Sequence, residues 1–310
     1  MMNLDDTTPL VVPPKKPWHK LRWQERRIVT ILPYTWLLIF FFVPFLLVFK
    51  ISLSEPVLSV PPYQEIFKWM DGILNIHLNL NNYIRMVTDP FYAQGFMTSL
   101  IIAAITTFGC LVLGFLIAYA IVCAPRHWRF ILLLMVVLPF WTSFLVRVYA
   151  WIGILSNTGF LNQLLLYLGI IDEPIQFLYN NFSVTIGIIY CYLPFMILPI
   201  YSVLDKIDPV YMEAAYDLGC RPWGAFWRIT LPLSMPGILS GCALVFIPAL
   251  GEFVIPEILG ASDSFMMGRI IWIEFFNNRD WPVASTVAIV MLLLFVVPIM
   301  ISQRRHNQRH

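Results

Sequence analysis

Six long stretches of the sequence are almost free of charged residues, and each is long enough to cross a membrane as a helix. A hydrocarbon core about 30 Å thick needs about 20 apolar residues at a rise of about 1.5 Å each. Lipid offers the backbone no hydrogen-bonding partner, so such stretches are expected to be helical even where they contain proline, with kinks at the prolines. The six stretches are residues 28–49, 97–122, 130–155, 182–204, 236–256 and 282–302.

The chain is therefore predicted to be an all-α membrane protein with six transmembrane helices. Its composition agrees with this class, because 59% of the residues are hydrophobic and only 12% are charged, which is unusual for a soluble domain. The apolar stretch that begins at Ile28 is too long for the core of a signal peptide and has no clear cleavage site. We expect it to remain as a permanent anchor.

The distribution of lysine and arginine predicts how the chain is oriented. Of the twenty, fourteen lie in the N-terminal segment, the second and fourth loops and the tail, and five lie in the other loops. Arg147 lies inside the third stretch. By the positive-inside rule, both termini are predicted to be cytoplasmic. The predicted organisation is a basic cytoplasmic segment, a six-helix domain with its main cytoplasmic loop, and a cytoplasmic tail, at residues 1–27, 28–303 (loop 205–235) and 304–310.

The fourth loop carries the most specific pattern in the chain. Asp208 can cap a helix that has Pro209 at its first position, and Gly219 can end that helix in a left-handed conformation. A second short helix is expected to end before Leu231. The two predicted helices cover residues 209–218 and 222–228. Together they form a helix-turn-helix knob on the cytoplasmic side.

Seven residues of this loop have a characteristic spacing. They are Glu213, Ala214, Ala215, Gly219, Ile229, Leu231 and Pro232. This is the pattern of the EAA loop (EAA, three residues, G, nine residues, I, one residue, LP), and it stands before the penultimate span on the predicted cytoplasmic side. The chain therefore resembles the permeases of binding-protein-dependent ABC importers, which are multi-pass proteins of the bacterial inner membrane.

The resemblance implies a type I ABC importer permease fold in which residues 213–219 form a coupling helix that docks in a cleft of a nucleotide-binding subunit. It implies two ATP-binding subunits, a second homologous permease subunit and a periplasmic binding protein as partners. The chain has no GxxxxGK[ST] motif, so it is predicted not to be an enzyme and to bind no cofactor, with ATP and magnesium held by the partner subunits. A swing of the coupling helix would turn the attached spans between inward-open and outward-open states.

Three further segments resemble polyamine permeases, and most closely the putrescine permease subunit of that group. They are residues 138–151, 246–257 and 275–282. A diammonium substrate would be recognised by carboxylates and aromatic faces, and acidic groups inside a membrane are functional candidates. The predicted substrate-pathway residues are Trp141, Tyr149, Tyr190, Tyr192, Glu252 and Glu257.

Glu252 has a second interpretation. Counted from the cytoplasmic ends of their stretches at about 1.5 Å per residue, Arg147 and Glu252 lie at similar depth, about 26 Å and about 24 Å. They can form an intramembrane ion pair, and Glu252 would then be structural. The aromatic residues also have a simpler role, because Trp and Tyr near the ends of spans commonly mark the membrane interface.

Other functional classes have little support in the sequence. The five cysteines lack CxxC spacing and the five histidines lie outside the apolar stretches, so no metal site and no catalytic residue is predicted. No basic patch stands clear of the membrane segments, which argues against nucleic-acid binding. An ABC importer of another small solute and a secondary transporter are the alternatives, although the broken-helix repeats of the latter are not visible. In the last outer loop, residues 265–276 suit either a helix along the outer membrane surface or a covering loop.

Overall fold

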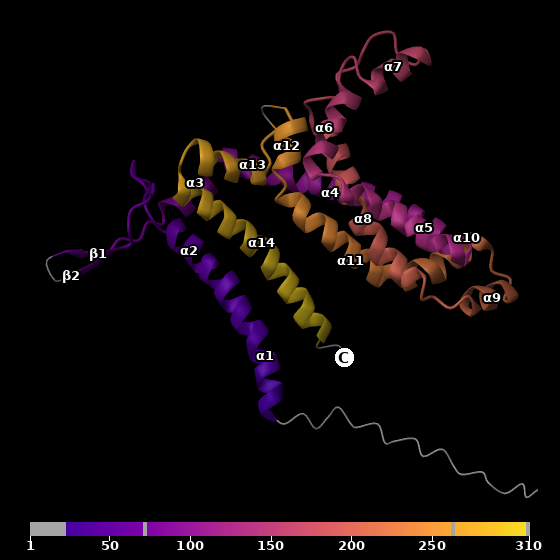
Figure 1. Ribbon diagram of the computed structural model, residues 1–310, viewed down its shortest axis with the longest axis horizontal. Coiled ribbons are helices and arrows are strands. Elements are labelled where there is room, and N and C mark those ends of the chain that lie inside the picture. The colour runs from indigo at the N-terminus through magenta and orange to yellow at the C-terminus, as the bar shows by residue number, and fades with distance from the viewer. Residues whose placement is uncertain (1–22, 71–72, 262–263, 308–310) are drawn as a thin grey trace, which may run out of the picture. The chain divides into compact units, whose positions relative to one another are not determined.

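The computed structural model describes residues 23–70, 73–261 and 264–307, and these are almost entirely helical (Figure 1). Most of the predicted basic segment, residues 1–27, and the last three residues of the predicted tail lie outside the described residues. One antiparallel hairpin, β1 (Phe67–Met70) with β2 (Ile73–Ile76), lies between α2 and α3, in the first loop that was predicted to be on the outer side. The all-α class is confirmed, with this hairpin as a small addition.

Long apolar helices are separated by short helices and by connecting segments without helix. In chain order they are α1 (Trp23–Leu37), η2 (Leu38–Phe42), α2 (Val43–Ser52), α3 (Asn81–Thr88), α4 (Pro90–Cys123), α5 (Arg126–Val137), η3 (Leu138–Trp141), α6 (Phe144–Leu155), α7 (Phe160–Tyr167), α8 (Asn181–Leu204), α9 (Val210–Asp217), α10 (Pro222–Ala225), η4 (Phe226–Thr230), α11 (Leu231–Leu250), α12 (Val254–Leu259), α13 (Met267–Trp272), η5 (Ile273–Asn277) and α14 (Trp281–Asn307). The chain divides into two compact units at Lys50 and Ile51.

Five helical runs among the described residues are long and apolar enough to cross a membrane, and a shorter apolar helix follows them. The five are Thr30–Ser52, Pro90–Cys123, Phe144–Tyr167, Asn181–Leu204 and Pro222–Leu250, and the shorter one is Trp281–Leu294. Each of the six predicted stretches overlaps one of these runs. The third span is interrupted where the prediction had one helix, and the fifth begins and ends at other residues than predicted.

The third predicted span, residues 130–155, is not one helix. The α-helical part α5 ends at Val137, a 3-10 turn follows, and α6 begins only at Phe144. Pro139 has no backbone N–H to continue the helix. The Thr142 hydroxyl donates a hydrogen bond of 2.7 Å to the Pro139 carbonyl, which satisfies one backbone acceptor at the break. The interruption therefore has a defined local structure.

The fifth predicted span, residues 236–256, begins earlier and ends earlier than expected. The helix runs from Pro222 through α10, the π turn η4 and α11 to Leu250. The expectation that the short helix ends before Leu231 is wrong. Pro232 lies in the first turn of α11, directly after the π turn, where a missing N–H is tolerated. The end of the span falls at Gly251, so the final predicted turn belongs to the separate helix α12.

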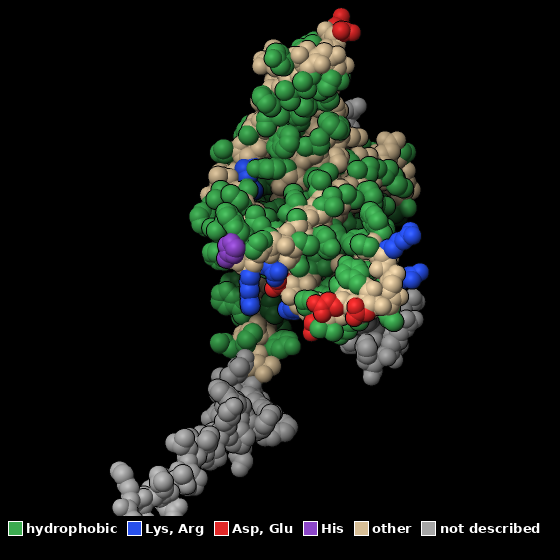
Figure 2. Space-filling model, turned by 90° about the vertical axis from the view of Figure 1, so that its right-hand side faces the viewer, with side chains coloured by type: hydrophobic (Ala, Val, Ile, Leu, Met, Phe, Trp, Pro, Cys, Tyr) green, Lys and Arg blue, Asp and Glu red, His purple; other side chains and the backbone are tan. Residues whose placement is uncertain are grey.

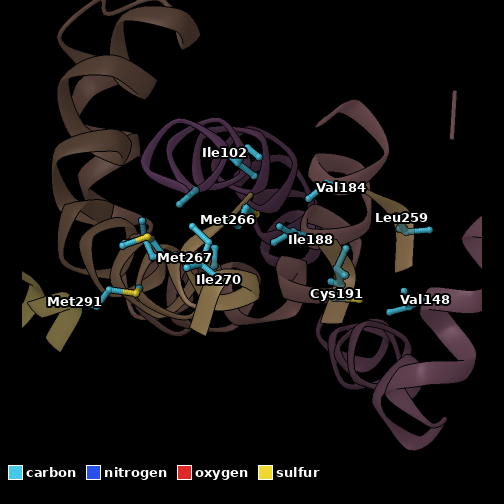
Figure 3. Packing of buried hydrophobic residues seen from close by; sticks show 14 of the residues in the cluster. Ile102, Val148, Val184, Ile188, Cys191, Leu259, Met266, Met267, Ile270 and Met291 are labelled. Carbon is cyan, nitrogen blue, oxygen red and sulfur yellow. The ribbon is translucent and has the colours of Figure 1, made fainter. Parts of the chain in front are cut away.

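Helices α4, α8 and α11 pack against one another and form the centre of the larger unit. Two glycines allow close approach, because a Cβ atom at Gly114 in α4 or at Gly241 in α11 would lie 2.8 Å or 2.7 Å from the Met196 side chain of α8. Small residues at helix contacts are typical of membrane bundles. A second group of buried side chains gathers at the other end of the unit, where Ile102, Ile188 and residues of α13 converge (Figure 3).

Of the two possibilities left open for residues 265–276, a surface helix or a covering loop, the segment is helical, as α13 and η5, and much of it is buried in the protein. Met266 and Met267 are fully buried and Ile270 is almost so. The backbone N–H of Met267 donates a 2.7 Å hydrogen bond to the Ser99 hydroxyl of α4. The apolar face that suggested lipid contact is instead packed into the core, because α13 lies against α4 and α14.

Candidate coupling surface and substrate pathway

The helix α9 begins with a local hydrogen bond that the sequence predicts. The Asp208 carboxylate accepts the backbone N–H of Val210 at 3.0 Å. Pro209 rather than Asp208 occupies the N-cap position, so α9 is shorter by one residue at each end than the predicted helix over residues 209–218. Glu213 lies in the first turn, where a negative charge interacts favourably with the helix dipole.

The end of α9 depends on a glycine. Gly219 has a φ of +80°, which glycine adopts at little cost. The Gly219 N–H donates to the Tyr216 carbonyl and the Cys220 N–H donates to the Ala215 carbonyl, each at 2.9 Å. This pair of bonds is the Schellman motif that closes helices at a left-handed residue. The chain therefore reverses at the predicted position.

The two faces of α9 differ in character. Ala215 is buried at 7% exposure, and the Thr230 hydroxyl lies 3.6 Å from the sulfur of Met212, which ties the inner face to η4. Glu213 and Ala214 are exposed. Figure 2 views this end of the molecule and shows charged side chains beside hydrophobic ones. Large apolar side chains exposed on α9 and on the segment that follows it are Val210, Tyr211, Tyr216, Leu218, Trp223 and Trp227.

The second half of the loop is anchored in the bundle. The ring of Phe226 packs edge-on against Phe115 and Tyr119 of α4, with centroids 5.6 Å and 6.0 Å apart. Leu231 packs against the buried cluster that contains Phe115. Ile229 is partly buried and Pro232 is exposed. The residues of the EAA pattern therefore lie in one connected structure: the short helix α9, largely exposed, and the helical run that continues into α11.

Glu252 lies at the break between α11 and α12 and is 7% exposed. The Tyr192 hydroxyl donates to one carboxylate oxygen at 2.6 Å. The backbone N–H groups of Val254 and Ile255 donate to the other at 3.1 Å and 3.4 Å. The structure thus brings together two predicted pathway residues, Tyr192 and Glu252, and places the carboxylate where it satisfies the first N–H groups of α12.

The predicted ion pair between Arg147 and Glu252 is absent from the described residues, whose ion pairs all lie elsewhere. The guanidinium carbon of Arg147 lies over the rings of Phe140 and Phe144, 4.9 Å and 5.8 Å from their centroids. Its buried Nε atom has no hydrogen-bond partner. Similar depth did not produce a pair because aromatic rings hold the arginine and local donors hold the glutamate.

The other predicted aromatic residues are separated. Tyr190 packs edge-on against Trp151 at 5.6 Å and borders an apolar groove of about 320 Å³ between α4, α5 and α8. Trp141 and Tyr149 are 75% and 57% exposed. Within the described residues, neither side chain stacks on another aromatic ring or forms a side-chain hydrogen bond. The structure does not join these two to Glu252.

Glu257, the second predicted acidic residue, is engaged by Arg269. The Arg269 Nε donates to its carboxylate at 2.7 Å, and the same guanidinium donates to the carbonyls of Ala261 and Ser264. Its carbon also lies 5.9 Å from the centroid of Phe265. Arg269 therefore ties α12 to α13, and Glu257 is part of this tie.

A third acidic residue, Glu274, escaped the sequence analysis. It is 8% exposed, and it accepts hydrogen bonds from the Tyr92 hydroxyl at 3.0 Å and from the Asn278 amide at 2.8 Å. An acid surrounded by apolar residues was the available signal. It was missed because its segment was expected to be either a helix along the membrane surface or a covering loop, and in both places a charge has access to water.

Asp280 lies near Glu274, just before the start of α14. Its carboxylate accepts the Val283 N–H at 3.1 Å and lies 3.9 Å from Arg85. Burial, and then the charge of Glu274, raise the pKa of Asp280 above its ordinary value, against the opposing effects of the Val283 N–H and Arg85.

Comparisons with known proteins agree with the geometry. Residues 110–309 match the family described as "Binding-protein-dependent transport system inner membrane component". The chain is 38% identical to the spermidine/putrescine transport system permease protein PotB of Escherichia coli (strain K12), over 87% of this chain and 94% of that protein. It is 36% identical to PotB of Salmonella typhimurium (strain LT2), over 91% and 93%.

The fold also matches solved structures. A bacterial ABC transporter involved in the import of the acidic polysaccharide alginate gives a TM-score of 0.68 at 16% identity, covering 95% of this chain and 99% of that one. At this identity the likeness concerns the fold alone. It agrees with the predicted permease architecture, and with the family match and the exposed loop it leads to one conclusion: the chain belongs to the binding-protein-dependent transport system inner membrane components, the permease subunits of ABC transporters.

Proposed function

We propose that this chain forms part of the translocation pathway for putrescine and related polyamines in an ATP-driven importer of the inner membrane. The observation that carries the proposal is the exposed EAA loop on a chain that is 36–38% identical to spermidine/putrescine permeases over most of its length. The energy is supplied by two partner ATP-binding subunits, which hold ATP and magnesium. A second permease subunit, which pairs with this chain, and a periplasmic binding protein complete the transporter.

The coupling role rests on the shape of α9. Its exposed face combines the charge of Glu213 with small Ala214 and several large apolar side chains, a combination suited to a cleft in a partner protein. Its inner face is tied to η4, which continues as α11. A partner that moves α9 therefore moves α11 with it, as a rigid body. In this proposal residues 1–27, the loop 205–235 and the tail 304–310 are cytoplasmic.

The substrate role rests on Glu252. Its carboxylate lies at the break between α11 and α12, within a predicted membrane span. Among the acidic side chains of the described residues, it is the one that accepts a hydrogen bond from a predicted pathway residue, Tyr192. A substrate ammonium that approaches this carboxylate gains a charge-assisted hydrogen bond. Trp141, Tyr149, Tyr190 and Glu257 are the further proposed pathway positions, of which Tyr190 has the best support because it borders a groove.

The test is transport by the whole complex, reconstituted in proteoliposomes with its binding protein and ATP. Wild-type complex is expected to take up labelled putrescine only when ATP is present. Glu213→Lys and Gly219→Val are expected to insert normally but to lose the stimulation of ATP hydrolysis by the loaded binding protein. Gly219→Asn is the matched control, because asparagine tolerates a positive φ better than valine does.

Two results would contradict the proposal. Wild-type stimulation in both the lysine and the valine variants would remove the coupling role of α9. Uptake of a different solute, with no response to putrescine or spermidine, would replace the substrate while leaving the importer class intact, which is the alternative that the family permits.

A further inference from the structure

Arg129 joins the ends of two helices on the face of the bundle that carries α9. Its Nη1 donates to the Asp205 carboxylate at 2.6 Å. Its Nε donates to the carbonyl of Ala124 at 3.0 Å. Ala124 is the C-cap of α4 and Asp205 is the C-cap of α8. One guanidinium on α5 therefore holds the ends of α4 and α8 together.

The bonded end of α8 is the end that leads to α9. Asp205 is followed by the short connection to Pro209, and in that connection the Asp208 carboxylate accepts the backbone N–H of Val210 at the start of α9. Ile207 in the same connection packs against the buried cluster of the bundle. The N-terminal end of α9 is therefore positioned through Asp205, which Arg129 binds. The inner face of α9 is held by the contact between Met212 and Thr230.

This ion pair is half exposed, with 29% of the Arg129 side chain and 39% of the Asp205 side chain open to solvent. A pair of this exposure contributes little to folding. Its donor geometry is nevertheless specific, because the two bonds of Arg129 use different nitrogen atoms and reach different helices. Such an arrangement fixes relative position more than it stabilises the fold.

We propose that Arg129 and Asp205 are positioning residues that make the turn between α4 and α5 move together with the coupling helix α9. The inference rests on the proposed function, since it concerns how movement at α9 spreads through the permease. Without the pair, α9 still docks on its partner but drives only α11, and the α4–α5 turn lags behind.

The experiment uses the reconstituted complex and three variants of Arg129 and Asp205. Arg129→Glu and Asp205→Arg each place like charges together, and the double variant R129E/D205R restores an ion pair of reversed polarity. Arg126→Glu is the matched control, because it makes the same charge change in the same turn and Arg126 forms no ion pair within the described residues.

The expected result is a fall of about tenfold in putrescine transported per ATP hydrolysed for each single variant, a coupling loss of the usual size. Membrane abundance and basal ATP hydrolysis are expected to stay near wild type. The double variant should recover much of the loss, and Arg126→Glu should show none. Unchanged transport per ATP in both single variants, with an active wild-type complex, overturns the positioning role of Arg129 and Asp205 and leaves the proposed function standing.

A second measurement does not depend on the substrate. Spin labels at His127 and Asp217, both exposed, report the distance between the α4–α5 turn and α9 in the full complex with its native cysteines replaced. If the ion pair between Arg129 and Asp205 holds the two segments together, Arg129→Glu should broaden the distribution of distances between the labels and Arg126→Glu should not. An unchanged distribution in R129E overturns the proposal even if the complex transports a solute other than a polyamine.

Discussion

Three carboxylates of this permease, Glu252, Glu274 and Asp280, hold backbone or side-chain donors at places where a helix starts or ends. Glu252 engages two N–H groups of α12 and a tyrosine hydroxyl. Glu274 engages a tyrosine and an asparagine from α4 and the outer loop. Asp280 accepts an N–H from the first turn of α14. Each acid is therefore part of the structure, and a transport role for any of them has to be separated from that part by experiment.

For Glu252 the separation comes from two substitutions. Glu252→Gln keeps one carbonyl oxygen for the α12 N–H groups but loses the charge that would attract an ammonium. Putrescine uptake is expected to fall by about tenfold or more, the loss expected for a charge-assisted contact of about 1.5–3 kcal/mol, while membrane abundance changes far less. The measurement is initial uptake normalised to the amount of permease in the membrane.

Tyr192→Phe is the matched control, because it removes the hydroxyl partner of Glu252 and leaves its carboxylate charged. Little change in Tyr192→Phe beside a large loss in Glu252→Gln supports contact with the substrate. Equal losses of uptake and abundance in both variants would show a structural pair only.

For Asp280 the raised pKa gives a prediction with a definite sign. A carboxyl whose pKa is higher in the folded than in the unfolded protein favours folding when protonated, and that contribution is lost as the pH rises through its folded pKa. Asp280→Asn keeps an oxygen for the Val283 N–H and removes the charge. The variant is expected to be more heat-stable than wild type near neutral pH and equal to it in acid, where wild-type Asp280 is already protonated.

Unfolding of the purified protein in detergent, followed across this pH range, measures the effect. A variant that is less heat-stable than wild type near neutral pH, with a deficit that disappears in acid, would mean that Arg85, and not burial, dominates the site. Arg85→Gln is a useful companion, since the loss of its positive charge should raise the pKa of Asp280 further.

At the level of elements, α13 packs so closely against the break after α11 that substitution at Gly268 is restricted. A Cβ atom at Gly268 would clash with the backbone carbonyl of Gly251 and lie 2.6 Å from that of Glu252. Backbone atoms cannot rotate aside, so Gly268→Ala is expected to destabilise the protein by about 1–3 kcal/mol, the usual cost of overpacking. Thermal unfolding in detergent measures the loss, and uptake should fall with it because the displaced segment holds Glu252.

Gly153 in α6 is the control, because nothing lies within 4 Å of a Cβ atom placed there. Gly153→Ala should be neutral or should stabilise the helix by up to about 1 kcal/mol. Equal stability of the two variants would mean that the contact between α13 and the break after α11 is looser than the structure shows.

The elements that the sequence predicted well are those with local causes. The apolar stretches are long enough to define helices without reference to their neighbours, and the signals at Asp208 and Gly219 act within one turn. The continuation of the helix through Pro232 was missed because a π turn before it has no sequence signature. The burial of α13 was missed because an apolar helical face looks the same whether lipid or protein covers it.

The candidate site shows the same division. The exposed EAA loop followed from a spacing of residues, and Glu252 followed from an acid in an apolar stretch. The interaction partner of Glu252 could not be identified from its predicted depth in the membrane alone. Depth places Arg147 and Glu252 at one level of the membrane but says nothing about which way each side chain turns around its helix, and the structure gives them different partners.

For the whole molecule, one helical run links the two candidate sites. From Pro222 to Leu250 it has 29 residues, which corresponds to a length of about 43 Å at about 1.5 Å per residue. Helix α9 precedes this run, and Glu252 follows it by two residues. In the proposed function, a rigid-body movement of α9 would be carried along α11 to the break that holds Glu252, which would connect an ATP-driven input to the proposed substrate site.

This route predicts the energy source of transport. In cells or proteoliposomes that contain the whole complex, collapse of the proton gradient with an uncoupler should leave putrescine uptake largely intact as long as ATP is kept constant. Depletion of ATP at a constant gradient should stop it, because in the proposed function α9 receives its movement from a partner that hydrolyses ATP. Glu213→Lys provides the internal control, since a permease that cannot engage its partner should resemble the ATP-depleted state while ATP is present. Uptake that follows the proton gradient and ignores ATP would instead identify a secondary transporter and make the exposed face of α9 irrelevant to transport.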